Sequence, residues 1–219
     1  MDDNGEAPLY WAATRGGADD VRILLDAGAN VNALLSFSAT GLRREAAQEG
    51  DNAGGDIGAL TDQPPGSETV AHTYTYYSAL HGAAKHGLVE TTEILLKRGA
   101  DPNLCVAGSG IWPVGCSALM LASNAGCYRV VERLLAYNAC TEKRDESGYT
   151  ALMLAARNGN DKVIQMLLSK GADPKAVREM KVKGASNSSE AISITALGLA
   201  QRAHDSGIPG ASACVQLLL

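Results

Sequence analysis

The histidines, cysteines and glycine-rich turns of this chain could carry out chemistry, but their spacing argues against it. His81 and His86 are five residues apart, so they do not share a helix face as the two histidines of a zinc-binding HExxH motif do. The chain has no GxxxxGK, GxGxxG or GxSxG motif that would hold a phosphate or activate a serine. We therefore predict no catalytic residue, no metal site, no cofactor and no enzymatic activity for these 219 residues.

The five cysteines do not indicate a reactive or metal-binding site either. They are odd in number, and no two of them form the CxxC pair typical of zinc ligands or of a redox dithiol. The chain also has no run of about 18 apolar residues and no basic-then-apolar leader, so nothing indicates membrane insertion or secretion. We expect reduced thiols and a cytoplasmic location, with the nucleus as an alternative.

Charge and composition limit the kind of partner. The formal net charge is −5, whereas proteins that bind nucleic acid or anionic membranes usually carry an excess of Lys and Arg. The chain is 46% hydrophobic but only 5% aromatic, which suits thin helical layers rather than one large globular core. We therefore expect neither nucleic acid nor a membrane as the partner.

The elements that must position any functional surface are clearest in residues 148–175, GYTALMLAARNGNDKVIQMLLSKGADPK. Thr150 can cap a short helix with a narrow apolar face, and Gly159 stands where that helix must end with a positive φ. A second amphipathic stripe follows, and Gly171 ends it. Helices this short are marginal alone, so a neighbouring copy must cover their apolar side.

This unit recurs with a period of 33 residues plus insertions. The residue that opens its first helix recurs as Ala7, Ser78, Ser117, Thr150 and Thr195. In four copies, a leucine of the first helix precedes a leucine of the second by 15 residues, in the pairs Leu9 and Leu24, Leu80 and Leu95, Leu119 and Leu134, and Leu152 and Leu167. The stop after the second helix is a glycine in three copies and Asn138 in the other, and Asn is the residue that best replaces glycine there.

The fifth copy is less regular. Leu197 precedes Leu217 by 20 residues, and His204 stands where the other copies have a glycine. We attribute the five extra residues to a longer turn between the two helices, over residues 206–210, which are rich in turn formers.

These features resemble the ankyrin repeat, which has a β-turn and two antiparallel helices in 33 residues. The family's TPLHxAA signature is matched by APLYWAA, SALHGAA, SALMLAS, TALMLAA and TALGLAQ, and its GADVN ending by GANVN, GADPN, NACTE and GADPK. Only His81 keeps the signature histidine, which is expected to hydrogen-bond the preceding loop. The resemblance implies an all-α solenoid of about five helix–turn–helix units.

The resemblance divides the chain into seven segments. They are repeat 1 (1–34), an acidic Gly/Pro-rich insertion (35–72), repeat 2 (73–105), repeat 3 with a lengthened finger (106–144), repeat 4 (145–177), a basic Ser/Gly-rich loop (178–193) and an incomplete repeat 5 (194–219). We expect the insertion to be a mobile loop with one short helix over about residues 42–48. The last residues, 217–219, are apolar, so we expect this end to pack on a neighbour or to continue into a longer protein.

Function must then come from the surface, and the resemblance places it on a concave face formed by turn tips and first-helix positions. The exposed pairs where the first helices end are Thr14 and Arg15, Lys85 and His86, Asn124 and Ala125, Arg157 and Asn158, and Arg202 and Ala203. Four of the five pairs contain a basic residue, which favours an acidic segment of a partner protein. The simpler alternative is that these side chains only solvate helix ends and favour the helix dipole.

Aromatic residues beside the turns are the second feature. They are Tyr74, Tyr76, Tyr77, Trp112 and Tyr149. Exposed Tyr and Trp often anchor interfaces, although these side chains could equally pack against the insertions. We predict a partner-binding set of Tyr74, Tyr77, Lys85, His86, Trp112, Tyr149, Arg157 and Asn158.

Two functions fit this reading. The first is a non-catalytic protein-interaction module, namely an adaptor, scaffold or targeting array, in which the acidic insertion could fold over the basic helix ends and compete with the partner. The second is a regulatory or substrate-presenting segment of a larger enzyme whose catalytic domain lies outside this chain.

Overall fold

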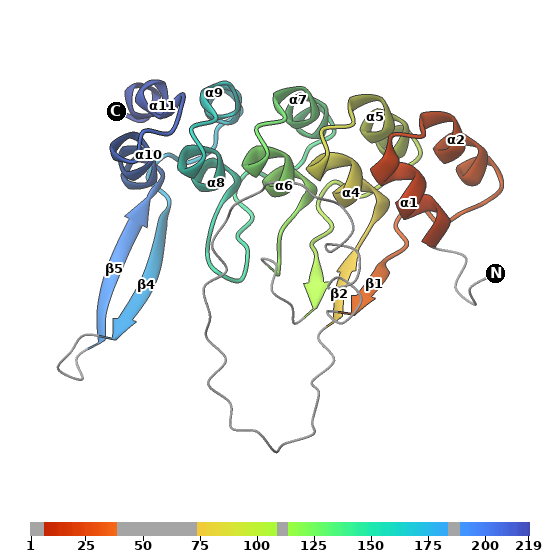
Figure 1. The fold of residues 1–219 in the computed structure, drawn as a ribbon, viewed down its shortest axis with the longest axis horizontal. Coiled ribbons are helices and arrows are strands. Elements are labelled where there is room, and N and C mark those ends of the chain that lie inside the picture. The colour runs from red at the N-terminus through yellow and green to blue at the C-terminus, as the bar shows by residue number, and fades with distance from the viewer. Residues whose placement is uncertain (1–6, 39–73, 109–113, 184–188) are drawn as a thin grey trace, which may run out of the picture.

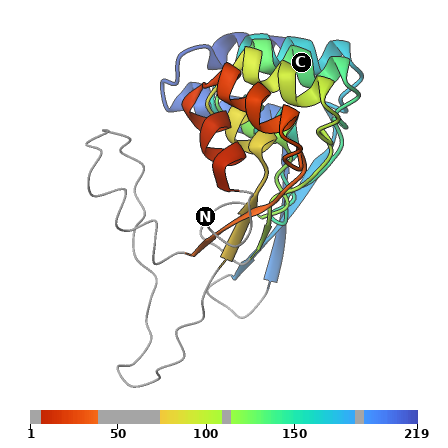
Figure 2. The ribbon, with the colours of Figure 1, turned by 90° about the vertical axis from the view of Figure 1, so that its right-hand side faces the viewer.

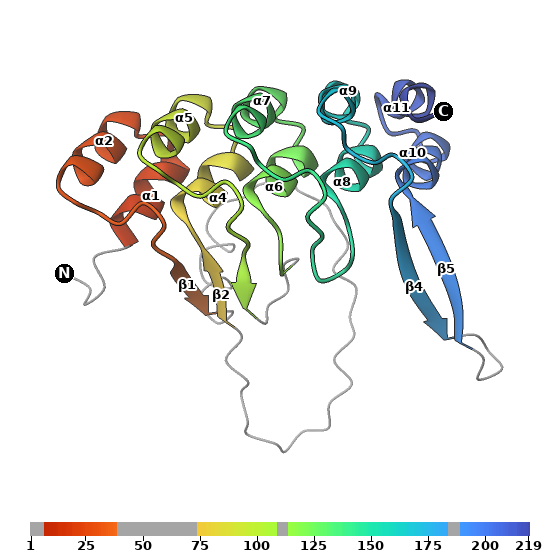
Figure 3. The same cartoon turned by 180° about the vertical axis from the view of Figure 1, so that it is seen from behind.

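The computed structural model describes residues 7–38, 74–108, 114–183 and 189–219. Within these ranges the chain forms two rows of short helices, which Figures 1 and 3 show from opposite sides. The inner row contains α1 (Ala7–Arg15), α4 (Ala79–Lys85), α6 (Ala118–Asn124), α8 (Ala151–Arg157) and α10 (Ala196–Asp205). The outer row contains α2 (Ala18–Asp26), α5 (Val89–Lys97), α7 (Tyr128–Ala136), α9 (Asp161–Ser169) and α11 (Ala211–Leu218).

Each inner helix packs against the outer helix that follows it and against the next inner helix. The predicted all-α solenoid of helix–turn–helix units is therefore confirmed. Five such units lie within the described ranges.

Local capping and turn chemistry sets both ends of these helices. The side chain of Thr150 accepts a hydrogen bond from the Met153 amide at 3.3 Å, and Ser117 caps α6 in the same way. Asn138, which follows the outer helix α7, has a φ of 60° and is the only non-glycine residue with positive φ in the described ranges. The sequence prediction that Asn138 takes the place of a glycine stop is thus confirmed.

An apolar layer runs between the two rows along the array. Leu95, Leu134 and Leu167, the second leucines of the 15-residue interval, are 0% exposed. Ala83 and Ala155 are also 0% exposed, and their small side chains let neighbouring helices approach closely. Since each unit buries its apolar side against the next, the stability of one repeat depends on its neighbours.

The fifth unit corrects one expectation. Helix α10 has 10 residues, whereas the equivalent helix α8 has 7. Three of the five extra residues therefore lengthen the helix, and only two lengthen the turn, where Gly207 takes over the stop with a φ of 73°. The predicted lengthening of the turn by all five residues is wrong, because the helix simply continues past His204 until it reaches a glycine.

The fingers that join the repeats contain strands that the sequence analysis did not predict. Strands β1 (Leu35–Ser38), β2 (Tyr74–Tyr77) and β3 (Ala107–Gly108) form an antiparallel sheet in that order. Leu35 lies opposite Tyr77, so the two sides of the insertion are paired at its base. Figure 2 shows that the fingers project away from the helical rows, on the side of the inner row.

A second hairpin takes the place of most of the loop expected over residues 178–193. Strands β4 (Val177–Lys183) and β5 (Ser189–Thr195) pair antiparallel, with Val177 opposite Thr195 and Lys183 opposite Ser189. Apolar and polar residues alternate from Ile192 to Thr195, which is the strand period. The sequence analysis predicted a loop because the segment is rich in Lys, Ser and Gly, and it overlooked this alternation.

Some expectations fall outside the described residues. These are Trp112 and residues 39–72 of the insertion, including the short helix expected over about residues 42–48. In the part of the chain that the structure describes, no helix is both long and apolar enough to cross a bilayer.

Candidate functional site

Four inner helices end at a residue of the predicted exposed pairs. Arg15, Lys85, Asn124 and Arg157 are the last residues of α1, α4, α6 and α8, and all four are exposed. Because successive inner helices pack side by side (Figure 1), these residues form a row along the array, which we call the exit row. Three of its four members are cationic.

The fifth unit does not continue the exit row as the sequence predicted. Because α10 is longer, Arg202 lies within the helix rather than at its end, and Ala203 is only 4% exposed. The predicted exposure of Ala203 is therefore wrong. Asp205 is the last residue of α10, so the row changes sign at this end.

Two arginines of the exit row lie over aromatic rings. The Cζ atom of Arg157 is 5.8 Å from the centroid of the Tyr149 ring, and that of Arg15 is 5.6 Å from the Trp11 ring. Such contacts hold the planar guanidinium without using its N–H donors. Neither arginine forms an ion pair with a carboxylate in the described ranges.

Tyr149 also contacts a second arginine, which the sequence analysis did not place near it. Arg178, on β4, lies with its Cζ atom 4.0 Å from the Tyr149 ring centroid and donates a hydrogen bond to the Tyr149 hydroxyl at 2.7 Å. The Arg178 Nε also donates to the Ser147 carbonyl. Tyr149 is therefore half-buried between two cations, and it positions Arg157 rather than standing as a free anchor.

Tyr77 belongs mainly to the packed interior. Its ring centroid is 6.4 Å from that of Tyr10 and 6.3 Å from that of His81. Burial raises the pKa of Tyr77 to about 12, so the phenol stays neutral. Tyr74 lies on β2, which is the central strand of the three-stranded sheet. Trp112 lies outside the described residues.

The remaining predicted site residues lie at the helix ends. Partial burial lowers the pKa of Lys85. Burial and then the charge of Lys85 lower the pKa of His86, which makes this histidine mostly neutral at pH 7. Lys85 and Arg157 thus supply positive charge on α4 and α8, while His86 and Asn158 follow them as neutral capping residues.

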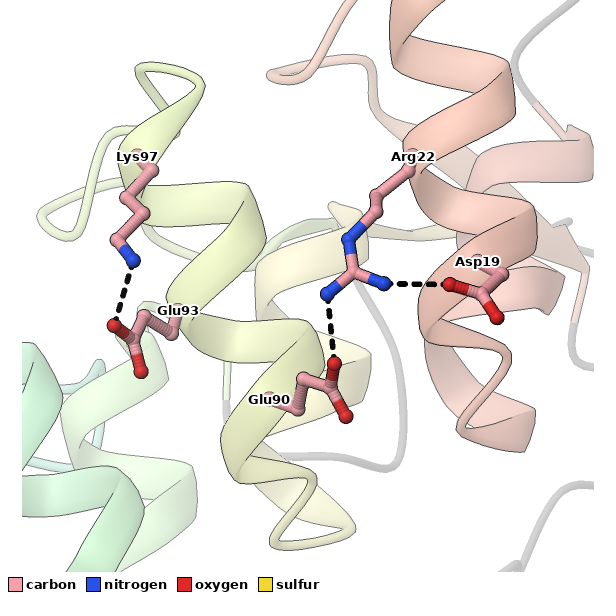
Figure 4. Close-up of polar contacts among 5 residues, drawn as sticks. All are labelled: Asp19, Arg22, Glu90, Glu93 and Lys97. Atoms are coloured by element: carbon pink, nitrogen blue, oxygen red, sulfur yellow. Dashed lines mark hydrogen bonds and ion pairs between the residues drawn. The ribbon is translucent and has the colours of Figure 1, made fainter.

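The outer row pairs several of its basic side chains with carboxylates, although Arg129 of α7 lies with its Cζ atom 5.9 Å from the centroid of the Tyr128 ring. Figure 4 shows Arg22 of α2 bound to Asp19 at 2.5 Å and to Glu90 of α5 at 2.7 Å. It also shows Lys97 bound to Glu93 at 2.8 Å. Arg98 with Asp26 and Arg133 with Glu93 complete the set, so every ion pair among the described residues lies on the outer helices or their caps.

The match to known sequence families decides what this array is. The family model for three copies of the ankyrin repeat matches residues 80–178, and the model for a single ankyrin repeat matches residues 4–34. Together they cover more than half of the chain.

The chain belongs to the ankyrin repeat family.

Curated relatives contain similar ankyrin segments within longer proteins. The chain is 32% identical over 184 residues to a probable E3 ubiquitin-protein ligase, XBOS33, of Oryza sativa subsp. japonica, covering 78% of this chain and 32% of that protein. It is 28% identical over 177 residues to the ankyrin repeat protein nuc-2 of Neurospora crassa, covering 80% and 16%. It is 40% identical over 83 residues to the mitochondrial disaggregase of Bos taurus, covering 31% and 12%. The chain thus spans less than a third of the length of each of these relatives.

Ankyrin repeats are protein-interaction modules, and the buried histidine of this array fits a structural role. The Nδ1 atom of His81 accepts a hydrogen bond from the Ser78 amide at 3.2 Å, so its proton lies on Nε2, which donates to the Leu104 carbonyl at 3.0 Å. The expected contact with the preceding loop is therefore present through Ser78, and a second one reaches the following finger. Burial lowers the pKa of His81 to about 4. Within the described ranges, no three His, Cys, Asp or Glu side chains come together as metal ligands would.

The sequence analysis named Asn124 and Asn158 among the exposed pairs but did not predict the hydrogen bonds that join them in the ankyrin array. The Nδ2 of Asn158 donates to Oδ1 of Asn124 at 2.8 Å, and Nδ2 of Asn160 donates to the Ser123 carbonyl at 2.8 Å. These bonds join the end of α6 to the end of α8. No pattern within one repeat indicated these bonds, because Asn124 and Asn158 occupy different positions of the repeat.

Proposed function

We propose that this chain is a non-catalytic adaptor, scaffold or targeting array that binds an acidic segment of a partner protein. The binding surface is the face formed by the inner helices and the fingers, with the exit row at its centre. Arg157, Lys85 and Arg15 supply the positive charge, and Tyr149 supplies aromatic surface beside Arg157. A protein segment is favoured over nucleic acid or a membrane because the chain as a whole is acidic.

The observation that carries the proposal is the contrast between the stacked arginines of the exit row and the ion-paired Arg22, Arg98 and Arg133 of the outer row. On the outer row, Arg22 and Arg98 are already neutralised by carboxylates of a neighbouring repeat. On the inner row, Arg15 and Arg157 rest on rings and keep their N–H donors. Stacked guanidinium groups with available donors suit carboxylates, which bind two parallel N–H groups at once.

Affinity capture with a matched pair of variants tests this proposal. The immobilised chain is compared with the double variant R15A/R157A on the inner row and with K97A/R133A on the outer row, which loses the same charge. We expect the wild type and the outer variant to retain the same proteins from a cell extract, identified by mass spectrometry. The inner variant should retain about tenfold less of those that carry acidic segments, corresponding to about 1.4 kcal/mol. Equal loss with both variants would contradict the proposal.

A second candidate is that the array presents a substrate to, or regulates, an enzyme domain outside these residues. It is favoured by the resemblance to segments of a ubiquitin ligase and a disaggregase, of which the chain covers 32% and 12%. Sequencing the full transcript distinguishes the two. An open reading frame with an additional catalytic domain supports this candidate, and a frame limited to these 219 residues removes it.

A further inference from the structure

The neutral member of the exit row, Asn124, forms an ordered pair of side-chain amides with Asn158, which caps α8. Asn158 donates through Nδ2 to Oδ1 of Asn124 at 2.8 Å and to the Asn124 carbonyl at 3.0 Å. An amide has two N–H donors and one oxygen acceptor, so the pair still holds unused groups. The Asn124 Nδ2 and the Asn158 Oδ1 have no hydrogen-bond partner among the described residues, although Asn124 is exposed and Asn158 half-buried.

One donor beside one acceptor is the complement of a main-chain amide. A peptide group offers a C=O that can accept from Asn124 and an N–H that can donate to Asn158. A carboxylate fits this place less well, because it only accepts and would meet the oxygen of Asn158. The pair therefore differs in chemistry from the arginines on α1 and α8.

The junction that carries this pair is unlike the other junctions of the array. At three junctions, the side chain that packs on the stop glycine of the preceding repeat is Leu88, Cys127 or Ile208. At the junction of α6 and α8 it is Asn160, which packs on Gly126 and donates to the carbonyls of Ser123 and Asn124 at 2.8 and 3.2 Å. The end of α6, and with it Asn124, is thus fixed by hydrogen bonds.

We infer that the Asn124 and Asn158 pair binds the main chain of an extended acidic segment as it crosses from α6 to α8. This inference rests on the proposed function. Arg157 then pairs with one acidic side chain of the same segment, next to the amides. Arg15 pairs with a second acidic side chain, at the α1 end of the exit row. The segment is held by its charges at the cationic positions and by its backbone between them.

The spacing of the helices sets the spacing of the acidic groups. Packed neighbouring helices lie about 10 Å apart, so the three steps from α1 to α8 span about 30 Å. An extended chain rises about 3.3 Å per residue, so the acidic side chains that meet Arg15 and Arg157 are about nine residues apart. Proline between them would remove the N–H that the amide pair reads.

Synthetic peptides provide the probe. The parent is a fluorescein-labelled peptide of about twelve Ser and Thr residues with two Glu about nine residues apart. One derivative has Gln in place of both Glu, and a set of derivatives carries a single N-methyl group at each residue between them in turn. Kd is measured by fluorescence anisotropy at low salt with the wild type, N158A, N124A and, as the control, the outer-row variant K97A/R133A.

The expected result is a pattern across peptides and variants. With the wild type and the K97A/R133A control, N-methylation at one or two positions should weaken binding about fivefold, the value of one net hydrogen bond. With N158A and N124A, the same N-methyl groups should have no effect. N158A should keep the fold, because Ala125 already occupies the equivalent position after α6, and N124A should keep it because the Asn124 side chain is exposed.

Two other results are distinguishable. If the Glu and Gln peptides bind the wild type equally, or neither binds, the proposed function fails and this inference with it. If the Glu peptide binds more tightly but no N-methyl group matters, or each weakens binding equally in the wild type and in both alanine variants, this inference is overturned and the proposed function stands. Thermal melts of all variants verify folding.

Discussion

The inner and outer rows are built from the same repeat but differ in how most of their arginines are held. On the outer row, cations of one repeat meet carboxylates of the next, as Arg22 meets Glu90. On the inner row, Arg15 and Arg157 lie on aromatic rings, and the neutral pair of Asn124 and Asn158 stands between cationic positions. This difference supports the proposal that the inner charges bind another molecule, whereas Arg22, Arg98 and Arg133 make contacts within the array.

The largest effect is expected in the layer between the two rows, on which both depend. Leu134→Ala, at a side chain that is 0% exposed, should lower the free energy of unfolding by about 2–5 kcal/mol through lost burial and a cavity. Leu217→Ala, at a side chain that is 39% exposed, is the control with a small effect. Urea denaturation measures both. Equal losses would show that the layer is not the shared core.

A pH titration of unfolding distinguishes the stability contributions of the two rows, and its effect is expected to be the next largest. Because the pKa of His81 falls from 6.5 in the unfolded chain to about 4 when folded, the unfolded state binds more protons between these values. Stability is therefore full above pH 6.5 and decreases towards pH 4, by about 2 kcal/mol between pH 7 and pH 5. His81→Met, which copies Met120 and Met153 of the next repeats, should remove this decrease.

The contribution of the outer row to stability changes in a different pH range. Its Glu93 has a lowered pKa because Lys97 binds it, so this contribution is lost only as pH falls towards and below the ordinary range of a carboxyl group. If denaturation midpoints of the wild type and His81→Met decrease in parallel between pH 7 and pH 5, the assignment to His81 is wrong.

These results show why some features could be predicted from the sequence. The stop at Asn138 and the cap at Thr150 depend on residues within one turn, so local chemistry specifies them. The leucine interval repeats without change in four copies, which made the two rows predictable. The extra helical turn of α10 was missed because nothing before Gly207 ends that helix.

The candidate site was less predictable, because its contacts join distant residues. Arg178 reaches Tyr149 only because β4 pairs with β5, and that pairing brings together strands that sequence composition described as a loop. The contact of Asn158 with Asn124 spans two repeats in the same manner. Such contacts depend on register between elements, which a single repeat does not encode.

Substitutions at Tyr149 test whether its ring positions Arg157 on the inner row. Tyr149→Leu removes the ring under Arg157 and should lower stability by about 1 kcal/mol and weaken binding of the Glu peptide about threefold. Tyr149→Phe keeps the ring and loses only the hydroxyl contact with Arg178, so its peptide affinity should stay close to that of the wild type. Equal affinities for the two variants would indicate that the ring does not position Arg157.

The smallest effect is expected on the outer row. The pair of Arg22 and Glu90 is exposed, and such pairs contribute little. Arg22→Ala and Glu90→Ala, alone and together, should each shift Tm by less than about 3 °C, with the coupling between them absent at high salt. A larger, salt-resistant coupling would mean that these ion pairs hold the array together.

The most direct test is the salt dependence of Glu-peptide binding, compared between variants of the inner row and of the outer row. The Kd of the Glu peptide is measured by anisotropy at about 0.05 M and 0.5 M salt for the wild type, R15A/R157A and K97A/R133A. The account predicts that salt weakens binding to the wild type and to the outer variant alike, and that the inner variant binds weakly at both concentrations. An inner variant that binds as tightly as the wild type, with the same response to salt, would contradict it.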